Sequence, residues 1–79
     1  MQNQGPHEEL ANEIRETLDN DPYTRRRKVE AVATGSGILL RGSVTSYFQK
    51  QMAQEAAKKT INGKLGIAIR LRNEIEVER

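Results

Sequence analysis

The strongest concentration of charge in the chain is a run of four basic residues, Arg25, Arg26, Arg27 and Lys28. Guanidinium and ammonium groups in such a run can bind phosphate, either on lipid headgroups or along a nucleic-acid backbone. Lys58, Lys59 and Lys64 would extend this candidate site if the end of the second predicted helix lies nearby. The alternative interpretation is a solvated linker into a strand, with Lys58 and Lys59 complementing the negative end of their helix.

Catalytic and metal-binding chemistry have few residues to build on. His7 is the only histidine, and together with Glu8 and Glu9 it would supply two or three ligands on one exposed helical turn, which makes a poor metal site. Ser36 and Ser46 have no histidine partner for nucleophilic catalysis. Paired-carboxylate catalysis needs a cleft that nothing in the sequence predicts. We therefore predict a non-enzymatic protein with no catalytic residues, no metal and no cofactor.

A second motif suggests nucleic acid. Gly63 and Gly66 form a G-x-x-G pattern with Lys64 and Leu65 between them, and KH domains clamp a nucleic-acid backbone with such a loop. A KH loop joins two helices, whereas this one is predicted to join a helix to a strand. An ordinary glycine-terminated helix also explains the pattern.

Two helices are predicted. The first runs from about residue 6 to residue 18, because Pro6 suits a first turn and Asp21-Pro22 ends the helix. Its apolar face is formed by Leu10, Ala11, Ile14 and Leu18. The second runs from about residue 47 to residue 60, after an N-cap at Thr45 or Ser46. Its apolar stripe is formed by Phe48, Met52, Ala53, Ala56 and Ala57.

The two aromatic residues that open the second helix are expected to differ. We expect Phe48 in the core, in line with Met52 at helical spacing. We expect Tyr47 at the surface, as an amphipathic anchor for a lipid interface or a partner.

Alternating apolar residues predict three strands. The first two, residues 29–33 and 38–44, form a hairpin whose tight turn requires a positive φ, which Gly35 and Gly37 can adopt. Gly42 lies inside the second strand on the inward face, where we expect the second helix to pass directly over it. The third strand runs from about residue 67 to residue 77.

The element order α-β-β-α-β predicts an α+β fold of two layers, with two helices on one face of a three-stranded sheet. The strand order is not determined by the pattern. The opposite face of the sheet would be open and would carry Arg41, Arg70 and Arg72 beside Glu30, Glu74 and Glu76. These charges form either a cross-strand ladder or a recognition surface for a partner or an anionic ligand.

The chain resembles the BON domain, a small module of bacterial osmotic-stress and cell-envelope proteins. The resemblance extends from the first helix to Val77 and rests on three motifs and on the polar, alanine-rich second helix. The motifs are a Leu-x-x-Asp-Pro type helix end with slightly different spacing (Leu18, Asp21, Pro22), a Gly-x-hydrophobic-x-Leu-x-Gly-x-Val type hairpin (residues 37–44) and a closing Asn-x-hydrophobic-x-Val (residues 73–77). Residues 60–66 depart from the family, which uses a shorter Gly-Val turn there.

The resemblance implies a non-enzymatic module that binds phospholipid surfaces or partner proteins of the envelope. Structural roles are then expected for Gly35, Gly37, Gly42 and Asn73. One alternative is a nucleic-acid-binding module that uses residues 25–28 and 63–66. Another is a structural adaptor whose exposed sheet edge recruits a second chain by strand addition.

Length and composition fit a single domain over residues 1–79 with an ordered core at about residues 6–78. There is no cysteine, and 13 basic against 11 acidic residues leave a net charge of +2. No apolar run approaches the roughly 18 residues of a membrane span. Met1 to Gln4 lack the features of a signal peptide. We therefore expect either a cytoplasmic protein or, as the resemblance implies, one in the periplasm or cell envelope after removal of a leader.

Overall fold

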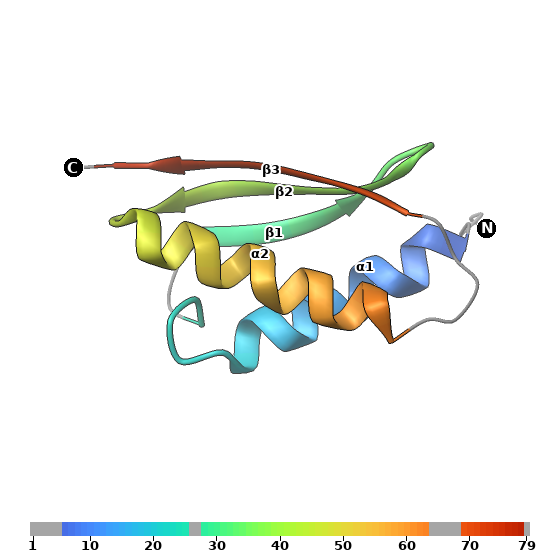
Figure 1. The fold of residues 1–79 in the computed structure, drawn as a ribbon, viewed down its shortest axis with the longest axis horizontal. Coiled ribbons are helices and arrows are strands. Elements are labelled where there is room, and N and C mark those ends of the chain that lie inside the picture. Colours follow the sequence, from blue (N-terminus) through green and yellow to red (C-terminus); the bar gives the residue numbers. More distant parts are fainter. Residues whose placement is uncertain (1–5, 26–27, 64–68, 79) are drawn as a thin grey trace.

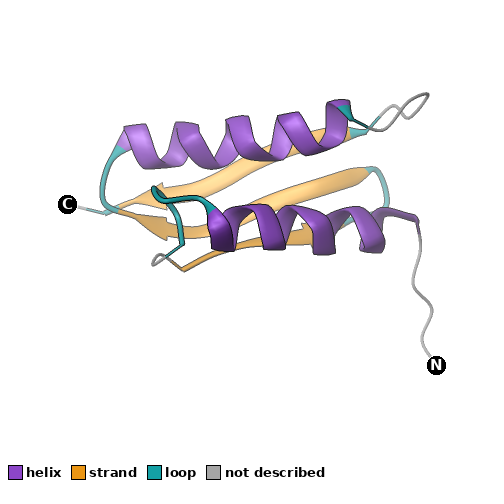
Figure 2. Cartoon of the chain, turned by 90° about the horizontal axis from the view of Figure 1, so that it is seen from below, coloured by secondary structure: helices purple, strands orange, loops and turns teal. Residues whose placement is uncertain are grey.

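The computed structural model describes residues 6–25, 28–63 and 69–78. The elements are α1 (Pro6–Asn20), β1 (Lys28–Ala33), β2 (Gly37–Val44), α2 (Tyr47–Asn62) and β3 (Arg70–Val77). The two helices lie side by side on one face of the sheet (Figures 1 and 2). The predicted fold class and element order are confirmed. The helices extend slightly beyond their predicted ends, and β3 begins at Arg70; residues 67 and 68 of the predicted strand lie outside the described residues.

The strands lie in the order β1-β2-β3, so β2 is central. β1 and β2 pair antiparallel through a short hairpin, whereas β2 and β3 pair parallel. A parallel pair needs a crossover connection, and α2 supplies it by returning the chain to the end of the sheet where β2 began. The mixed direction of the strands thus follows from one tight turn and one helical crossover.

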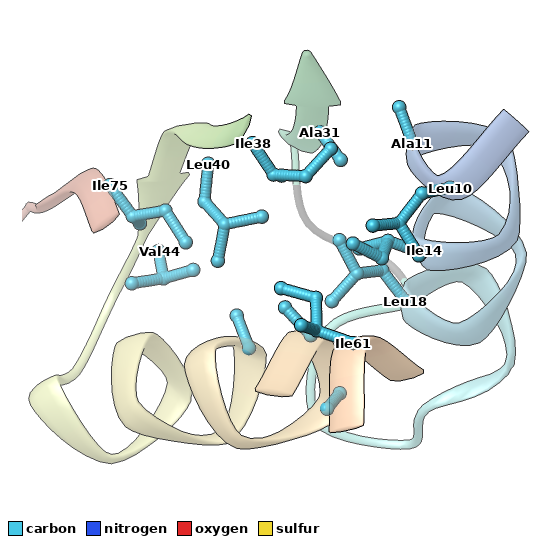
Figure 3. Packing of buried hydrophobic residues seen from close by; sticks show 13 residues of the cluster. Leu10, Ala11, Ile14, Leu18, Ala31, Ile38, Leu40, Val44, Ile61 and Ile75 are labelled. Carbon is cyan, nitrogen blue, oxygen red and sulfur yellow. The ribbon is translucent and has the colours of Figure 1, made fainter. Parts of the chain in front are cut away.

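The core is aliphatic. Its fully buried large side chains are Ile14, Leu18, Ile38, Leu40, Val44 and Ile75. Ile14 and Leu18 point from α1 toward Ile61 of α2, and Ile38 and Leu40 point from the sheet into the same space (Figure 3). On α2 the buried positions are mainly alanine (Ala53, Ala56 and Ala57), and these small side chains let the helix lie close to the sheet.

The second helix begins where the sequence predicts. Ser46 is the N-cap of α2, with extended backbone, and its Oγ accepts the Gln49 backbone N–H at 3.1 Å. In return, the Gln49 Oε1 accepts the Thr45 backbone N–H at 2.8 Å. This reciprocal arrangement resembles a capping box, and it fixes the direction in which α2 leaves β2.

Asn73 joins β3 to α2. Its Nδ2 donates to the Lys50 backbone oxygen at 3.2 Å and to the Gln54 Oε1 at 3.1 Å. Its Oδ1 accepts the Ile75 backbone N–H at 3.1 Å. Asn73 is the polar position among the inward residues of β3, and these bonds satisfy it there.

The expectation about the hairpin glycines is wrong. Among the described glycines only Gly42 has a positive φ, so Gly35 and Gly37 do not serve the turn in that way. The turn is closed instead by Thr34, whose backbone N–H donates to the Gly37 oxygen at 2.8 Å and whose Oγ1 accepts the Gly37 N–H at 3.0 Å. A Cβ at Gly37 would lie 2.0 Å from the Arg70 backbone oxygen. Gly37 therefore permits the close approach of β3.

The expectation that α2 excludes a side chain at Gly42 is also wrong. Its φ is +132°, and a Cβ there would lie 1.7 Å from the Lys28 backbone oxygen and 2.9 Å from the Val29 Cα. The atoms that exclude a side chain thus belong to the neighbouring strand β1 and not to α2. A glycine is required because no other residue combines this φ with such a close backbone contact.

We predict that Gly42→Ala destabilises the protein strongly. The added methyl group meets the backbone of β1, and the positive φ disfavours any side chain, at a combined cost of at least about 2 kcal/mol. In a domain of this size that cost lowers the melting temperature by on the order of 10 °C. The matched control is Gly35→Ala, because Gly35 has open space around it and no positive φ. Equal melting of the two variants by circular dichroism would contradict this account.

Candidate functional site

The loop that leads into the basic run (residues 25–28) is closely held. The Asp21 backbone oxygen accepts the N–H groups of Thr24 at 3.1 Å and Arg25 at 2.9 Å, and the Asp21 Oδ1 accepts the Tyr23 N–H at 2.8 Å. Thr24 is buried, and its Oγ1 donates to the Leu18 backbone oxygen at 2.7 Å. This last bond satisfies a carbonyl at the end of α1 that has no partner within the helix. The loop therefore holds Arg25 in a defined place.

The described members of the basic run lie at one end of the molecule. Arg25 and Lys28 are both exposed, and Lys28 opens β1 opposite Ser43 of β2. Arg26 and Arg27 lie outside the described residues. The start of α2 lies at this same end of the molecule (Figure 1).

Three aromatic side chains share this end. Tyr23 and Phe48 pack edge to face, with ring centroids 4.9 Å apart and ring planes at 90°. Even so, Tyr23 is 46% exposed, Phe48 52% and Tyr47 69%. We call Tyr23, Arg25, Lys28, Tyr47 and Phe48 the aromatic–basic end. Exposed aromatic rings beside cations can enter a membrane interface or stack on a partner.

The expectation that Phe48 lies in the core is wrong, whereas Tyr47 lies at the surface as expected. At 100° per residue, Phe48 lies about 140° around α2 from Ala53, which is completely buried. Phe48 therefore points well away from the centre of the buried stripe and meets Tyr23 of the preceding loop. The sequence contained this signal in the spacing of Phe48 from the alanines, but the pairing of Phe48 with Tyr23 is a tertiary contact.

The structure does not bring the other predicted lysines to this end. Lys58 lines a hollow beside β3, together with Ile69 and Leu71. Lys59 lines a different hollow, beside the end of α1, where it faces the acidic residues Asp21 and Glu55. Both lysines are exposed, and ten residues of helix separate Lys58 from Phe48, about 15 Å of rise.

The G-x-x-G motif is described only at its first residue. Gly63 follows α2, and its N–H bonds the Lys59 oxygen at 3.2 Å and the Thr60 oxygen at 3.3 Å. Lys64 and the rest of the motif lie outside the described residues. What is described is therefore a glycine at a helix end, which needs no ligand to explain it.

The open face of the sheet alternates in charge. Arg41, Arg70 and Arg72 are exposed, and the strand register places Glu30, Arg41 and Glu74 in one row across the three strands. Arg72 and Glu74 form an ion pair along β3. A row of alternating sign favours the ladder interpretation over a patch that binds anions. Such exposed pairs each contribute only about 0.2–1 kcal/mol.

The residues considered as metal ligands make other contacts. His7 bonds the Thr34 backbone oxygen through Nδ1 at 3.1 Å, and Glu8 lies 3.5 Å from the Arg15 guanidinium. In the described ranges, no three histidine, aspartate or glutamate side chains gather as a metal site would require. Nor is any described helix both long enough and apolar enough to cross a membrane.

The structure defines a small α+β fold with two helices on one face of a three-stranded mixed sheet. The family model of the BON domain matches residues 7–78, nearly the whole chain. The protein therefore belongs to the BON domain family. A search of the curated proteins found no match. Membership supports, in general terms, a module associated with stress and the cell envelope, within a family of non-catalytic lipid- or protein-binding domains.

We predict that Tyr23 and Phe48 stabilise each other. Replacing Tyr23 and Phe48 by leucine, singly and together, should give a coupling energy of about 0.5–1.5 kcal/mol in a double-mutant cycle of unfolding free energies. The control is Tyr47→Leu, which is more exposed than either partner and should show no coupling to Tyr23→Leu. Additive effects of the two replacements at Tyr23 and Phe48 would show that the ring contact does not exist in solution.

Proposed function

We propose that the aromatic–basic end binds the interface of anionic phospholipid membranes. The observation that carries the proposal is that the large exposed hydrophobic side chains of the described residues, Tyr23, Tyr47 and Phe48, come from the loop and the helix start at the end of the molecule that also holds Arg25 and Lys28 (Figure 1). Tyrosine and phenylalanine place apolar rings at headgroup level, and tyrosine keeps its hydroxyl in water. Arginine and lysine are attracted to the anionic headgroups at the same depth.

Charge and rigidity both support this use. Each basic residue near an anionic surface contributes about 1 kcal/mol, so the basic run can hold the domain weakly and reversibly. The loop that presents Arg25 is already ordered by Thr24 and Asp21, so binding costs little ordering entropy there. Glu76 and Glu78 lie at the β3 side of this end, because Glu76 pairs with Ser43 and the Glu78 N–H bonds the Val44 oxygen. We therefore expect contact through the side formed by β1, the loop and the start of α2.

The proposed location is the periplasm or cell envelope of a bacterium, and the alternative is the cytoplasmic face of the membrane. A partner protein of the envelope could use the same surface, since aromatic and arginine side chains also dominate protein interfaces. Membrane binding differs from protein binding in that its affinity depends on the charge of the lipid.

Vesicle co-sedimentation tests the proposal. We expect binding to vesicles that contain phosphatidylglycerol or cardiolipin, little binding to phosphatidylcholine vesicles, and loss of binding above a few tenths molar salt because the charges are screened. The double replacement Arg25→Ser and Lys28→Ser should weaken binding roughly 30-fold, since two contributions of about 1 kcal/mol are lost. Replacement of all four residues 25–28 by serine should abolish it.

The matched control is Lys58→Ser with Lys59→Ser, which removes the same charge elsewhere and should leave vesicle binding nearly unchanged. Tyr47→Ser should weaken binding without lowering the melting temperature, because Tyr47 is largely exposed. The proposal fails if the control variant loses as much binding as the double replacement, or if neutral vesicles bind equally. A shift of a single-stranded nucleic-acid probe without vesicle binding would favour the nucleic-acid alternative.

A further inference from the structure

The two edges of the sheet are not equivalent. At the edge formed by β1, the Arg15 Nε of α1 donates to the Ala31 backbone oxygen at 2.9 Å, and His7 bonds the Thr34 oxygen at 3.1 Å. Arg15 is itself held by Asn12 and by Glu8. The Ala31 oxygen is an outward-facing group of β1 that a further strand would need, and Thr34 lies in the turn just beyond that strand, so α1 covers part of this edge, a common way to protect it.

The edge formed by β3 is open in the part of the chain that the structure describes (Figure 1). The Arg70 and Glu78 N–H groups bond backbone oxygens of Ser36 and Val44, so the even-numbered residues of β3 face β2. The backbone groups of the odd-numbered residues, from 71 to 77, therefore face outward. Within that set the Ile75 N–H has a partner, the Asn73 Oδ1. Alternate residues of this eight-residue strand thus present a row of hydrogen-bonding groups along its outer edge.

The side chains of this strand are arranged so that they complement themselves. On the open face, β3 carries Arg70 and Arg72 before Asn73 and Glu74 and Glu76 after it. Reversing the strand about Asn73 exchanges every positive charge for a negative one. We propose that β3 pairs antiparallel with β3 of a second copy of this chain, about a twofold axis at Asn73, to form a continuous six-stranded sheet.

In this register Arg72 lies opposite Glu74 of the second copy, and Arg70 lies opposite Glu76. The symmetry makes four such pairs. All four fall at positions of the antiparallel ladder without direct hydrogen bonds, where opposite side chains lie closest. A shift of the register to either neighbouring position places Glu74 opposite Glu74 or Arg72 opposite Arg72. Parallel pairing in register sets arginine against arginine, so the charges disfavour that direction and add one like-charge contact to each shifted register.

The helix-covered side of the edge agrees with the same register. There Leu71 lies opposite Ile75 of the second copy, and Ile69 lies opposite Val77. Ile69, Leu71 and Val77 are only partly buried within one molecule, although they pack against the core. Ile69 and Leu71 line a shallow hollow of about 330 Å³ between β3 and α2, so the helix does not close this edge. A second strand would cover these apolar side chains.

Two bonds within one molecule are exchanged on pairing. The Ile75 N–H must leave the Asn73 Oδ1 for the Leu71 oxygen of the second copy. Arg72, which pairs with Glu74 of its own strand, must divide its interaction between that Glu74 and Glu74 of the second copy. The gain is therefore smaller than the number of new contacts, and the interface is small. A reversible dimer is expected, of the strength typical of small interfaces.

This inference does not depend on the proposed membrane binding. Antiparallel pairing of β3 places the two aromatic–basic ends at opposite ends of the six-stranded sheet. The residues at issue, 70 to 76, are also separate from Arg25, Lys28, Tyr23, Tyr47 and Phe48. Failure of vesicle binding and failure of self-association are therefore separate results.

Sedimentation velocity over a wide range of protein concentration tests the pairing. The wild type should pass from monomer to dimer as concentration rises, with no larger species, because α1 covers part of the β1 edge. The acidic variant (Arg70→Glu, Arg72→Glu) and the basic variant (Glu74→Arg, Glu76→Arg) should each self-associate at least about tenfold more weakly, since attraction becomes repulsion at all four pairs. An equal mixture of the two variants should form a heterodimer.

The decisive control joins all four replacements in one chain. That variant has the composition and net charge of the wild type, and its charges are again opposite about Asn73, so it should dimerise like the wild type. Lys28→Glu, a single charge reversal on the same face at the β1 edge, should leave the dimer unchanged. Melting temperatures of all variants show that each is folded. The proposal is overturned if the wild type remains monomeric at the highest concentration, or if its dimer is insensitive to the acidic and basic variants.

Discussion

The whole structure depends on how closely β1 and β3 can approach the central strand β2. Two glycines of β2 permit that approach from its two sides. Gly37 faces the Arg70 backbone and Gly42 faces the Lys28 backbone, and in both places a Cβ would lie within 2.0 Å of a neighbouring oxygen. Because β2 is bonded on both edges, these contacts define the register of the sheet. The charged row on the open face follows from that register.

A second consequence of small side chains is the position of the aromatic residues. Ala53, Ala56 and Ala57 let α2 lie close to the sheet over an aliphatic core. Phe48 projects from another side of α2, at its first turn, where it packs on Tyr23. A domain of this size buries only part of its apolar surface, so what it leaves exposed is informative about function. Here that surface lies next to the basic run.

The asymmetry of the sheet edges follows from the topology. α1 lies beside β1, so its polar side chains reach the outer backbone groups of that strand, as Arg15 does at Ala31. β3 joins the sheet through a crossover on the other side of β2, and no described strand pairs with its outer edge. The same connectivity that completes the core therefore leaves one strand open and one blocked. Because β3 is positive before Asn73 and negative after it, its charges favour a second strand that runs antiparallel to it.

Local patterns in the sequence determined the elements and their order, the Leu10, Ile14 and Leu18 face of α1 and the Ser46 cap, because each depends on residues within a few positions of one another. They could also locate the basic run and the alternation of β3. Only the tertiary structure decided the strand order, the parallel pairing of β3 and the contact of Tyr23 with Phe48. It also showed that the backbone of β1 is what excludes a side chain at Gly42. It also separated Lys58 and Lys59 from Arg25 and Lys28. These features are contacts between backbones and side chains far apart in the chain, and periodicity carries no information about which distant atoms come to share one space.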